Sequence, residues 1–498
     1  MVTPYQSLSF SSTPFLSNMP ETPENHSTVR IVTAASLFDG HDASINIMRR
    51  ILQSSGAEVI HLGHNRSVAQ IVDAALQEDV NAIAISSYQG GHVEFLKYMI
   101  DMLSERGGEK IRVFAGGGGV IVPEEVAELH DYGVSRVYTP EDGQNLGLQG
   151  MIADMLERSR YRTEEDAPSS LDPVIGGERR ALSHLLSAIE NDTLEQGLLV
   201  QLQTQAGQLE RPVPVLGITG TGGAGKSSLT DEVILRFRNG QGDALKIALI
   251  AVDPTRRKTG GALLGDRIRM NAIDHPNVFM RSVATRGASS EVPDYIRQMV
   301  DACKLAGFDM VIVETPGIGQ GDAGIAELVD CSLYVMTPEF GAQSQLEKID
   351  MLDFADVVAI NKFDRRGAAD AYRDVSKQVQ RNHEAFAAEV ESMPVFGTIA
   401  SRFNDDGVTA LYQHLLETLR GYGLEERDNL LPHTSVRISS SHSQLIPSER
   451  SRYLAEIAAT VRGYKARAAT QAKFARQCQQ LRATQDMLVA VSYTHLRA

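Results

Sequence analysis

Cysteine is scarce in this chain of 498 residues, with only Cys303, Cys331 and Cys478, all far apart in the sequence. Their spacing fits neither a disulfide framework nor a cysteine-rich zinc site. We therefore expect a protein of a reducing compartment, the cytoplasm, and a buried structural role for each cysteine.

Long apolar runs and clustered positive charge are also lacking. No apolar stretch reaches the roughly 18 residues that span a membrane, so no membrane partner is expected. The first 29 residues contain no Lys or Arg and are rich in Ser, Thr and Pro, so we expect neither a signal nor a transit peptide there and predict a disordered segment over 1–28. The net charge is −15, and because Lys and Arg form no patch, nucleic acid is not an expected partner.

Two series of short apolar runs alternate with helical patterns, which predicts two parallel α/β sheets covered by helices. The first series indicates a flavodoxin-like domain over 29–160, and a polar segment with Pro and Gly indicates a linker over 161–178. The second series predicts a P-loop α/β domain over 179–425. The remainder, 426–498, is expected to be a helical linker with one long helix over 447–490. The predicted strands are "VRIVTAASLF", "AEVIHLG", "VNAIAISSY", "KIRVFAGGGG" and "VSRVYTP", then "VPVLGITG", "KIALIAVDP", "MVIVETPG", "CSLYVMTP", "DVVAINKFD" and "PVFGTIA".

The segment "GTGGAGKS", Gly220 to Ser227, matches G-x-x-x-x-G-K-[ST] between a predicted strand and a predicted helix. Its glycines let backbone N–H groups surround a phosphate, and the helix N-terminus adds positive potential. We expect Lys226 to reach the β- and γ-phosphates and Ser227 to bind Mg²⁺. The other phosphate-binding residues expected here are Gly222, Gly223, Ala224, Gly225 and Ser228.

The motif "NKFD", Asn361 to Asp364, ends a later predicted strand. The Asp364 carboxylate can accept hydrogen bonds from N1–H and the exocyclic amine of guanine, whereas adenine presents an acceptor where guanine has N1–H. Asn361 and the Lys362 stem are expected to support the ring. The nucleotide is therefore predicted to be GTP or GDP.

Acidic residues between these two motifs are candidate ligands of Mg²⁺ and candidate catalytic groups together with Lys226. Asp253 and Glu314 each end a predicted strand, and Asp266 lies in a Gly-rich stretch that we interpret as a switch loop. Gly317 follows Glu314 by three residues, so that E-T-P-G stands where many GTPases have D-x-x-G.

A second candidate site follows the first predicted strand, in "DGHD", Asp39 to Asp42. Ligands of open α/β sheets lie beyond the carboxyl ends of the strands, where we also expect Ser86 and the four glycines of "AGGGG". Asp39 could hold His41 through its far ring nitrogen, as for a metal-ligating imidazole. The alternative is a polar loop in a domain like that of response regulators.

The pattern "DGHD…SSYQGGH…AGGGG" resembles the cobalamin-binding domain of acyl-CoA mutases, whose pattern is D-x-H-x-x-G, S-x-L and G-G. The resemblance implies that His41 is the lower axial ligand of cobalt and that the displaced nucleotide tail passes Ser86, Gly116 and Gly117. Two positions depart from the pattern: Ser44 replaces its last Gly, and Tyr88 replaces Leu.

The second half resembles the mutase-chaperone GTPases of the MeaB kind, through "AVDPTRRKTGGALLGDRIRM", "RSVATRG" and "ETPGIGQ". By this resemblance Ser227, Asp253, Asp266, Glu314 and Thr315 would bind Mg²⁺, and Arg269 would contact the nucleotide. Pro316, within the predicted switch motif "ETPGIGQ", is a position at which the sequence departs from the family's pattern.

The order of the parts over residues 29–488 resembles the fused isobutyryl-CoA mutases. The resemblance implies adenosylcobalamin, GTP hydrolysis that gates cofactor loading, conversion of isobutyryl-CoA to n-butyryl-CoA, and a homodimer. Because the sequence stops at "VSYTHLRA" without a substrate barrel, acyl-CoA is expected to bind only through a missing or separate barrel. Two alternatives stay open: a GTP-dependent cobalamin chaperone for a separate mutase subunit, and a cobalamin-sensing regulator.

Overall fold

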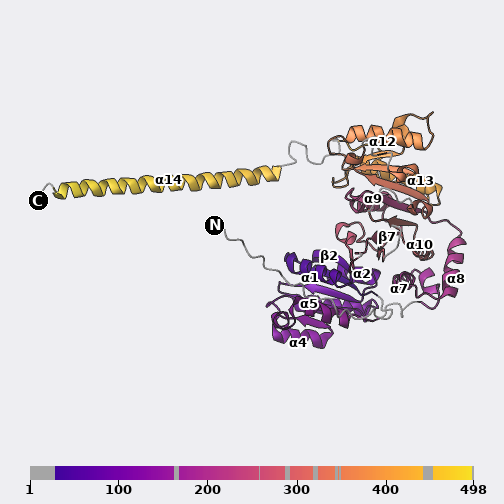
Figure 1. Cartoon of the computed structure of the whole chain (residues 1–498), viewed down its shortest axis with the longest axis horizontal. Helices are drawn as coiled ribbons and strands as arrows, with labels where there is room; N and C mark the ends of the chain where they lie inside the picture. Colours follow the sequence, from indigo (N-terminus) through magenta and orange to yellow (C-terminus); the bar gives the residue numbers. More distant parts are fainter. Residues whose placement is uncertain are drawn as a thin grey trace, which may run out of the picture. The chain divides into compact units, whose positions relative to one another are not determined.

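The computed structural model describes residues 28–161, 168–256, 258–286, 292–317, 324–341, 346, 349–440 and 453–495. The predicted disordered segment over 1–28 and the predicted helix start at Pro447 lie almost wholly outside these ranges. The chain divides into two compact units, residues 1–439 and 440–498 (Figure 1). The first unit contains two parallel β-sheets, and both candidate sites belong to it.

The first sheet has six parallel strands in the order β5-β4-β3-β1-β2-β8. Five of them follow the predicted apolar runs, and the order β2-β1-β3-β4-β5 is that of a flavodoxin-like domain. The strands are β1 (Arg30–Ser36), β2 (Glu58–Arg66), β3 (Ala82–Ser86), β4 (Arg112–Gly116), β5 (Arg136–Tyr138) and β8 (Ala262–Leu264).

Helices cover both faces of this sheet, which is why its strands are nearly continuous apolar runs. On one face, Ile31 of β1 packs in a buried core with side chains from α1 (Asp42–Ser54) and α5 (Pro140–Arg158). On the other face, Val32 packs with side chains from the remaining helices. Those helices are α2 (Val68–Gln77), α3 (His92–Glu105) and α4 (Pro123–Tyr132).

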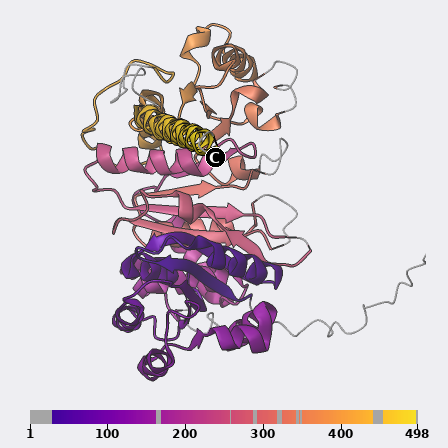
Figure 2. The ribbon, with the colours of Figure 1, turned by 90° about the vertical axis from the view of Figure 1, so that its left-hand side faces the viewer.

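The sixth strand, β8, comes from the second half of the sequence and was not among the predicted strands. It pairs in parallel with β2, with Ala262, Leu263 and Leu264 opposite Glu58, Val59 and Ile60. Ala262 and Leu264 are buried in the first domain's core. Figure 2 shows the pink strands of the second half directly beside the indigo strands of the first sheet. Three residues after a Gly pair carry too little periodicity to predict a strand.

The second sheet has seven parallel strands in the order β13-β12-β11-β6-β10-β7-β9. Six follow the predicted runs, while β9 was missed because Arg281 interrupts its apolar pattern. The strands are β6 (Val215–Gly220), β7 (Ile247–Asp253), β9 (Val278–Ala284), β10 (Met310–Glu314), β11 (Cys331–Met336), β12 (Val357–Asn361) and β13 (Val395–Thr398).

Two helices, α9 (Lys226–Gly240) and α13 (Asp406–Gly421), pack on one face of the second sheet. The other face packs against α7 (Arg179–Glu190), α8 (Gln196–Gly207), α10 (Ile296–Leu305) and α12 (Ala368–Asn382). The short elements are α6 (Asp172–Ile175), within the predicted linker, and the 3₁₀ helices η2 (Asp266–Arg269), η3 (Gly324–Glu327), η4 (Pro338–Phe340), η5 (Asp350–Asp353) and η6 (Val390–Ser392).

A buried network of ion pairs connects the two domains. Arg30 of β1 contacts both Glu58 and Glu190 at 3.1 Å, and Arg286 contacts Glu58 at 2.6 Å. Arg281 of β9 contacts Glu190 at 2.8 Å. Every carboxylate of this network has at least one guanidinium partner, which offsets the large cost of removing charges from water.

The second unit contains α14 (Tyr453–His495), whose described side chains, over 455–490, are almost all exposed. The prediction of a long helix is confirmed there. Cys303 and Cys331 are buried as expected, but the prediction for Cys478 is wrong, because α14 leaves it exposed. No helix among the described residues is long and apolar enough to cross a membrane.

Tight packing holds β8 in the first domain. A Cβ atom at Gly261 would lie 2.1 Å from the Gln53 carbonyl oxygen, whereas one at Gly265 would meet only the Leu263 side chain, at 3.5 Å. We predict that Gly261→Ala lowers the free energy of unfolding by about 1–3 kcal/mol and that Gly265→Ala changes it little. Urea denaturation of the three proteins measures this, and equal stability of the two variants would contradict the docking of β8.

Candidate functional site

The P-loop lies between β6 and α9, and its backbone shape requires glycine. Gly220, Gly223 and Gly225 have φ of +145°, +74° and +88°, which disfavour other residues. A Cβ atom at Gly220 would lie 1.9 Å from the Val335 carbonyl oxygen of the neighbouring strand β11. The loop therefore presents its backbone at the start of a helix, where N–H groups and the helix dipole favour phosphate.

Lys226 is buried, and its ammonium group donates to the Gly220 carbonyl oxygen at 3.1 Å within the loop. Of the other predicted loop residues, Gly222 and Gly223 are exposed, Ala224 is buried and Ser228 is half-buried. A Cβ atom at Gly317 would lie 2.3 Å from Lys226 Nζ, and one at Gly222 would lie 2.8 Å from the Gly317 carbonyl oxygen. The E-T-P-G segment and the P-loop are thus in close contact.

The carboxylates of Asp266 and Glu314 meet at the Ser227 hydroxyl, whose Oγ lies 2.9 Å from Asp266 Oδ1 and 2.8 Å from Glu314 Oε1. Glu314 Oε2 and Asp253 Oδ2 are buried without a hydrogen-bond partner. Burial and the nearby Asp266 raise the pKa of Glu314 to about 7. Burial, with Asp266 and Glu314 close by, raises the pKa of Asp253 well above its ordinary value.

This donor set fits Mg²⁺, because a cation would supply the positive charge that the buried carboxylates lack. Among the described residues, no three His, Cys, Asp or Glu side chains gather closely enough to hold a metal alone. That arrangement suits Mg²⁺, which commonly takes one or two carboxylates plus phosphate oxygens and water. Ser227, Asp266 and Glu314 would hold the ion, with Asp253 beside them.

One predicted Mg²⁺ ligand, Thr315, and one predicted nucleotide contact, Arg269, make no contact of the predicted kind among the described residues. The Thr315 hydroxyl bonds to the Thr219 hydroxyl at 2.8 Å rather than to the carboxylates. The Arg269 side chain is 67% exposed and lies 4.0 Å from Asp266. Their predicted roles therefore stay predictions.

The "NKFD" segment at the end of β12 packs on the P-loop. Asn361 donates from Nδ2 to the Ala224 carbonyl oxygen at 2.8 Å, and Lys362 donates from Nζ to the Gly223 carbonyl oxygen at 2.6 Å. Asp364 is exposed beyond them. The structure thus joins the two motifs, which are 134 residues apart between Ser227 and Asn361, with the Asp364 carboxylate in solvent at the rim.

The histidine site lies at the carboxyl end of β1. The buried Asp39 accepts from His41 Nδ1 at 2.8 Å and from the Tyr88 backbone N–H at 2.6 Å. Burial alone would raise the pKa of Asp39, but the hydrogen bonds from the Tyr88 and His41 amides lower it. With Nδ1 bound to a carboxylate, Nε2 of the exposed ring is the nitrogen left for a metal ion.

Beside this histidine, an apolar cavity of about 290 Å³ lies between α1, α5 and the ends of β3 and β4. Ser86, Gly116 and Gly117, the residues predicted to contact the nucleotide tail, are among those that line it. The Ser86 hydroxyl is buried without a hydrogen-bond partner, and a Cβ atom at Gly117 would lie 2.0 Å from the Ser87 carbonyl oxygen. An apolar slot with one unpaired hydroxyl fits a flat aromatic group with a polar edge, such as the nucleotide base of cobalamin.

The two departures from the expected pattern meet in space, which sequence reasoning missed. The hydroxyls of Ser44 and Tyr88 lie 2.8 Å apart, and the Tyr88 ring centroid lies 5.6 Å from that of His41. The Tyr88 ring therefore lies beside His41, and its hydroxyl is hydrogen-bonded to Ser44, which stands where the pattern has Gly.

Two family models match the chain. "B12 binding domain" matches residues 29–141, and "Methylmalonyl Co-A mutase-associated GTPase MeaB" matches residues 181–428. A protein of Pyrococcus horikoshii named as a GTPase is 32% identical over 271 residues, which cover 54% of this chain and 82% of that protein. The chain belongs to the MeaB family of GTPases. It binds cobalamin through its first domain and hydrolyses GTP, with Mg²⁺, through its second.

Longer relatives contain both domains. A fused isobutyryl-CoA mutase of Cupriavidus metallidurans is 65% identical over 92% of this chain, and one of Nocardia farcinica is 59% identical over 91%. The matched part is 42% of each of those proteins. The chain thus spans less than half the length of these relatives.

The raised pKa of Glu314 predicts how Mg²⁺ binding depends on pH. Below about pH 7 the carboxyl group holds a proton that competes with the cation, so Mg²⁺ affinity should increase between pH 6 and pH 8. Glu314→Gln should bind Mg²⁺ more weakly and lose this increase. Calorimetric titration of the nucleotide-free protein with Mg²⁺ measures both, and equal wild-type affinity at the two pH values would contradict the prediction.

Proposed function

We propose that this chain is the cofactor-binding and GTP-hydrolysing part of an adenosylcobalamin-dependent acyl-CoA mutase that converts isobutyryl-CoA to n-butyryl-CoA. In this proposal, GTP binding and hydrolysis gate the loading of the cofactor. The observation that carries it is the presence of both sites in one unit, with a strand of the GTPase domain in the cobalamin-binding sheet. Acyl-CoA would bind to a barrel in a further segment or a separate subunit.

In the cobalamin-binding domain, the chain's own residues would hold and shield the cofactor. Bound adenosylcobalamin supplies the radical that starts the rearrangement of the carbon skeleton. Asp39 holds the His41 ring through Nδ1 and would keep the proton on that nitrogen, which would leave Nε2 to bind cobalt. The cavity beside Ser86 and Gly117 would take the displaced nucleotide tail.

In the GTPase domain, catalysis is positioning and electrostatic stabilisation. The P-loop amides and Lys226 would neutralise charge on the β- and γ-phosphates as the bond to the leaving oxygen breaks. Asp266 and Glu314, with the Ser227 hydroxyl, would orient Mg²⁺ and its water molecules. Asp364 would select guanine.

The proposal includes a cytoplasmic homodimer. Its support is α14, where Phe474, Leu481 and Leu488 are each more than half exposed and recur every seven residues. Apolar residues that recur in a seven-residue repeat form the line along which helices pair in coiled coils, and a second copy of α14 would cover it.

The first test is titration of the purified chain with adenosylcobalamin, followed by its absorption spectrum. We expect a spectrum in which histidine replaces the nucleotide base as the ligand of cobalt, and loss of that spectrum in His41→Ala. Asp39→Asn should weaken binding by about 10–100-fold, because the ring loses its orienting carboxylate. Tight binding with an unchanged spectrum in His41→Ala would contradict the proposed ligand.

Asp364→Asn tests the choice of guanine. An amide donates a proton where the carboxylate accepts, so the variant should lose about 2–3 kcal/mol of GTP binding, a factor of roughly 30–150. It should regain activity with XTP, whose carbonyl oxygen replaces the exocyclic amine. Steady-state hydrolysis of GTP and XTP by both proteins measures this, and GTP hydrolysis unchanged in the variant would contradict the role of Asp364.

A further inference from the structure

The magnesium carboxylate Asp266 follows a strand that belongs to the other domain. β8 is paired with β2 of the cobalamin-binding sheet, one glycine separates it from η2, and η2 begins at Asp266. The first residue of β8 is also bound to that domain, because the Ala262 N–H donates to the Ala57 carbonyl oxygen at 3.2 Å. The position of the Asp266 backbone is therefore determined by the cobalamin-binding domain.

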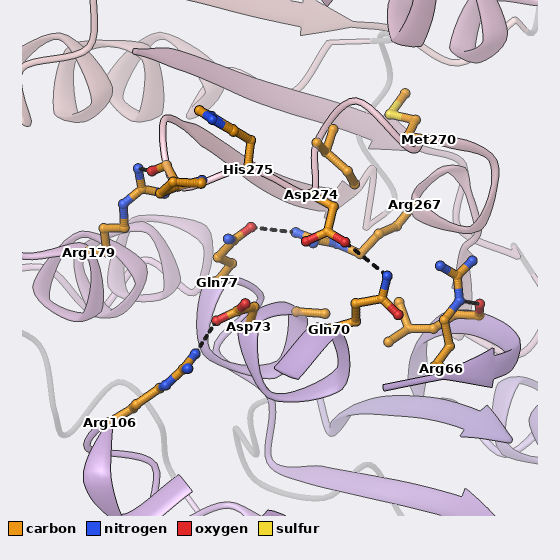
Figure 3. A pocket seen from close by; sticks show the side chains of 14 residues that line it. Arg66, Gln70, Asp73, Gln77, Arg106, Arg179, Arg267, Met270, Asp274 and His275 are labelled. Carbon is orange, nitrogen blue, oxygen red and sulfur yellow. Dashed lines mark hydrogen bonds and ion pairs between the residues drawn. The ribbon is translucent and has the colours of Figure 1, made fainter. Parts of the chain in front are cut away.

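The next residue, Arg267, is directed into that domain (Figure 3). Its Nε donates to Glu78 Oε1 at 3.1 Å, and its Nη2 donates to Gln77 Oε1 at 3.0 Å. Nη2 also donates to the Met280 carbonyl oxygen at 2.7 Å. The Arg267 side chain is 8% exposed and that of Glu78 is fully buried, so water has little access to the pair.

Glu78 is itself held firmly. Besides Arg267, it accepts from the Ser282 N–H at 2.9 Å and from the Ser282 hydroxyl at 2.8 Å. Removing one partner of a buried ion pair leaves the other charge uncompensated, which is strongly unfavourable. Arg267 thus has one well-defined position, and moving Glu78 would move it.

A second contact fixes the same turn. Ile268 packs against Gly63 of β2 so closely that a Cβ atom at Gly63 would lie 2.8 Å from Ile268 Cδ1. In a 3₁₀ helix successive side chains are about 120° apart, so Asp266, Arg267 and Ile268 point in three directions. Because the side chains of Arg267 and Ile268 are both held by the cobalamin-binding domain, the direction of the Asp266 side chain is fixed as well.

We infer that Arg267 is a positioning residue for the magnesium carboxylate Asp266, and that Glu78 of the cobalamin-binding domain holds it in place. The GTPase site is then complete only when that domain is docked. A displacement of β2 or α2 would therefore move Asp266, the proposed Mg²⁺ ligand, through Glu78 and Arg267. This inference rests on the proposed function only in taking Asp266 as a ligand of Mg²⁺.

The test compares two neighbouring substitutions in the cobalamin-binding domain, Glu78→Gln and Asp79→Asn. Asp79 is a matched control, because it is also buried and also crosses to the GTPase domain, where it contacts Arg180 at 2.9 Å and the Ser187 hydroxyl at 2.6 Å of α7. Neither of these two contacts involves η2. The measurement is the Mg²⁺ concentration that gives half-maximal GTP hydrolysis by the full chain. The dissociation constant for Mg²⁺ from calorimetric titration of the nucleotide-free chain is measured beside it and should change in the same direction.

We expect Glu78→Gln to raise that concentration by on the order of tenfold or more, as losses of orienting partners do at metal sites. In Asp79→Asn this Mg²⁺ concentration should stay within about twofold of the wild-type value, because Asp79 orients no proposed metal ligand. Equal effects of the two substitutions, or none from Glu78→Gln, would overturn the inference.

Two further controls keep the result interpretable. If Glu78→Gln does not fold, Ile268→Ala replaces it, with an increase in the same direction expected and an unchanged Mg²⁺ dependence overturning the inference. If wild type itself shows no more GTP hydrolysis than Lys226→Ala, the proposed function fails. An active wild type with an unaffected Glu78→Gln variant overturns only the role of Glu78 and Arg267.

Discussion

The parallel pairing of β8 with β2 is the interaction on which the arrangement of both sites depends. A strand at the edge of a sheet leaves a row of unpaired N–H and C=O groups, and β2 would be such an edge without Ala262–Leu264. The strand that covers it is continuous with the turn that carries Asp266. Backbone hydrogen bonds of one domain therefore constrain the proposed Mg²⁺ ligand of the other.

Buried charge extends the same constraint across the interface. Arg30, Arg267 and Arg281 face Glu58, Glu78 and Glu190 with little access to water, and Arg286, which is 22% exposed, pairs with Glu58 and Glu190 at the edge of the network. Such networks contribute little net stability compared with apolar packing, but they tolerate few alternative arrangements, because an unpaired buried charge is costly. A hinge of the two domains would have to break several of these pairs together. The interface thus suits the transmission of small displacements better than it suits free rotation.

The sequence predicted the parts of the sites whose signal is local. The P-loop, "NKFD" and the His41 loop each place their chemistry within a few consecutive residues at the end of a strand, and the structure shows Asn361 and Lys362 on the P-loop. It could not predict β8, because three residues become a strand only where another strand offers its edge. Nor could it predict that Arg30 and Arg281 are buried, since a charged residue in an apolar run ordinarily indicates solvent. Cys478 was wrongly predicted to be buried, since almost all described side chains of helix α14 are exposed.

Hydrogen–deuterium exchange of the full chain tests the central claim, that β8 is a strand of the cobalamin-binding sheet, most directly. The account predicts that peptides covering residues 260–266 exchange as slowly as those covering 58–64, because both are paired in one sheet and open together. Exchange of residues 260–266 within seconds, while residues 58–64 stay protected, would contradict it. In that case Asp266 would lie on a loop independent of the cobalamin-binding domain.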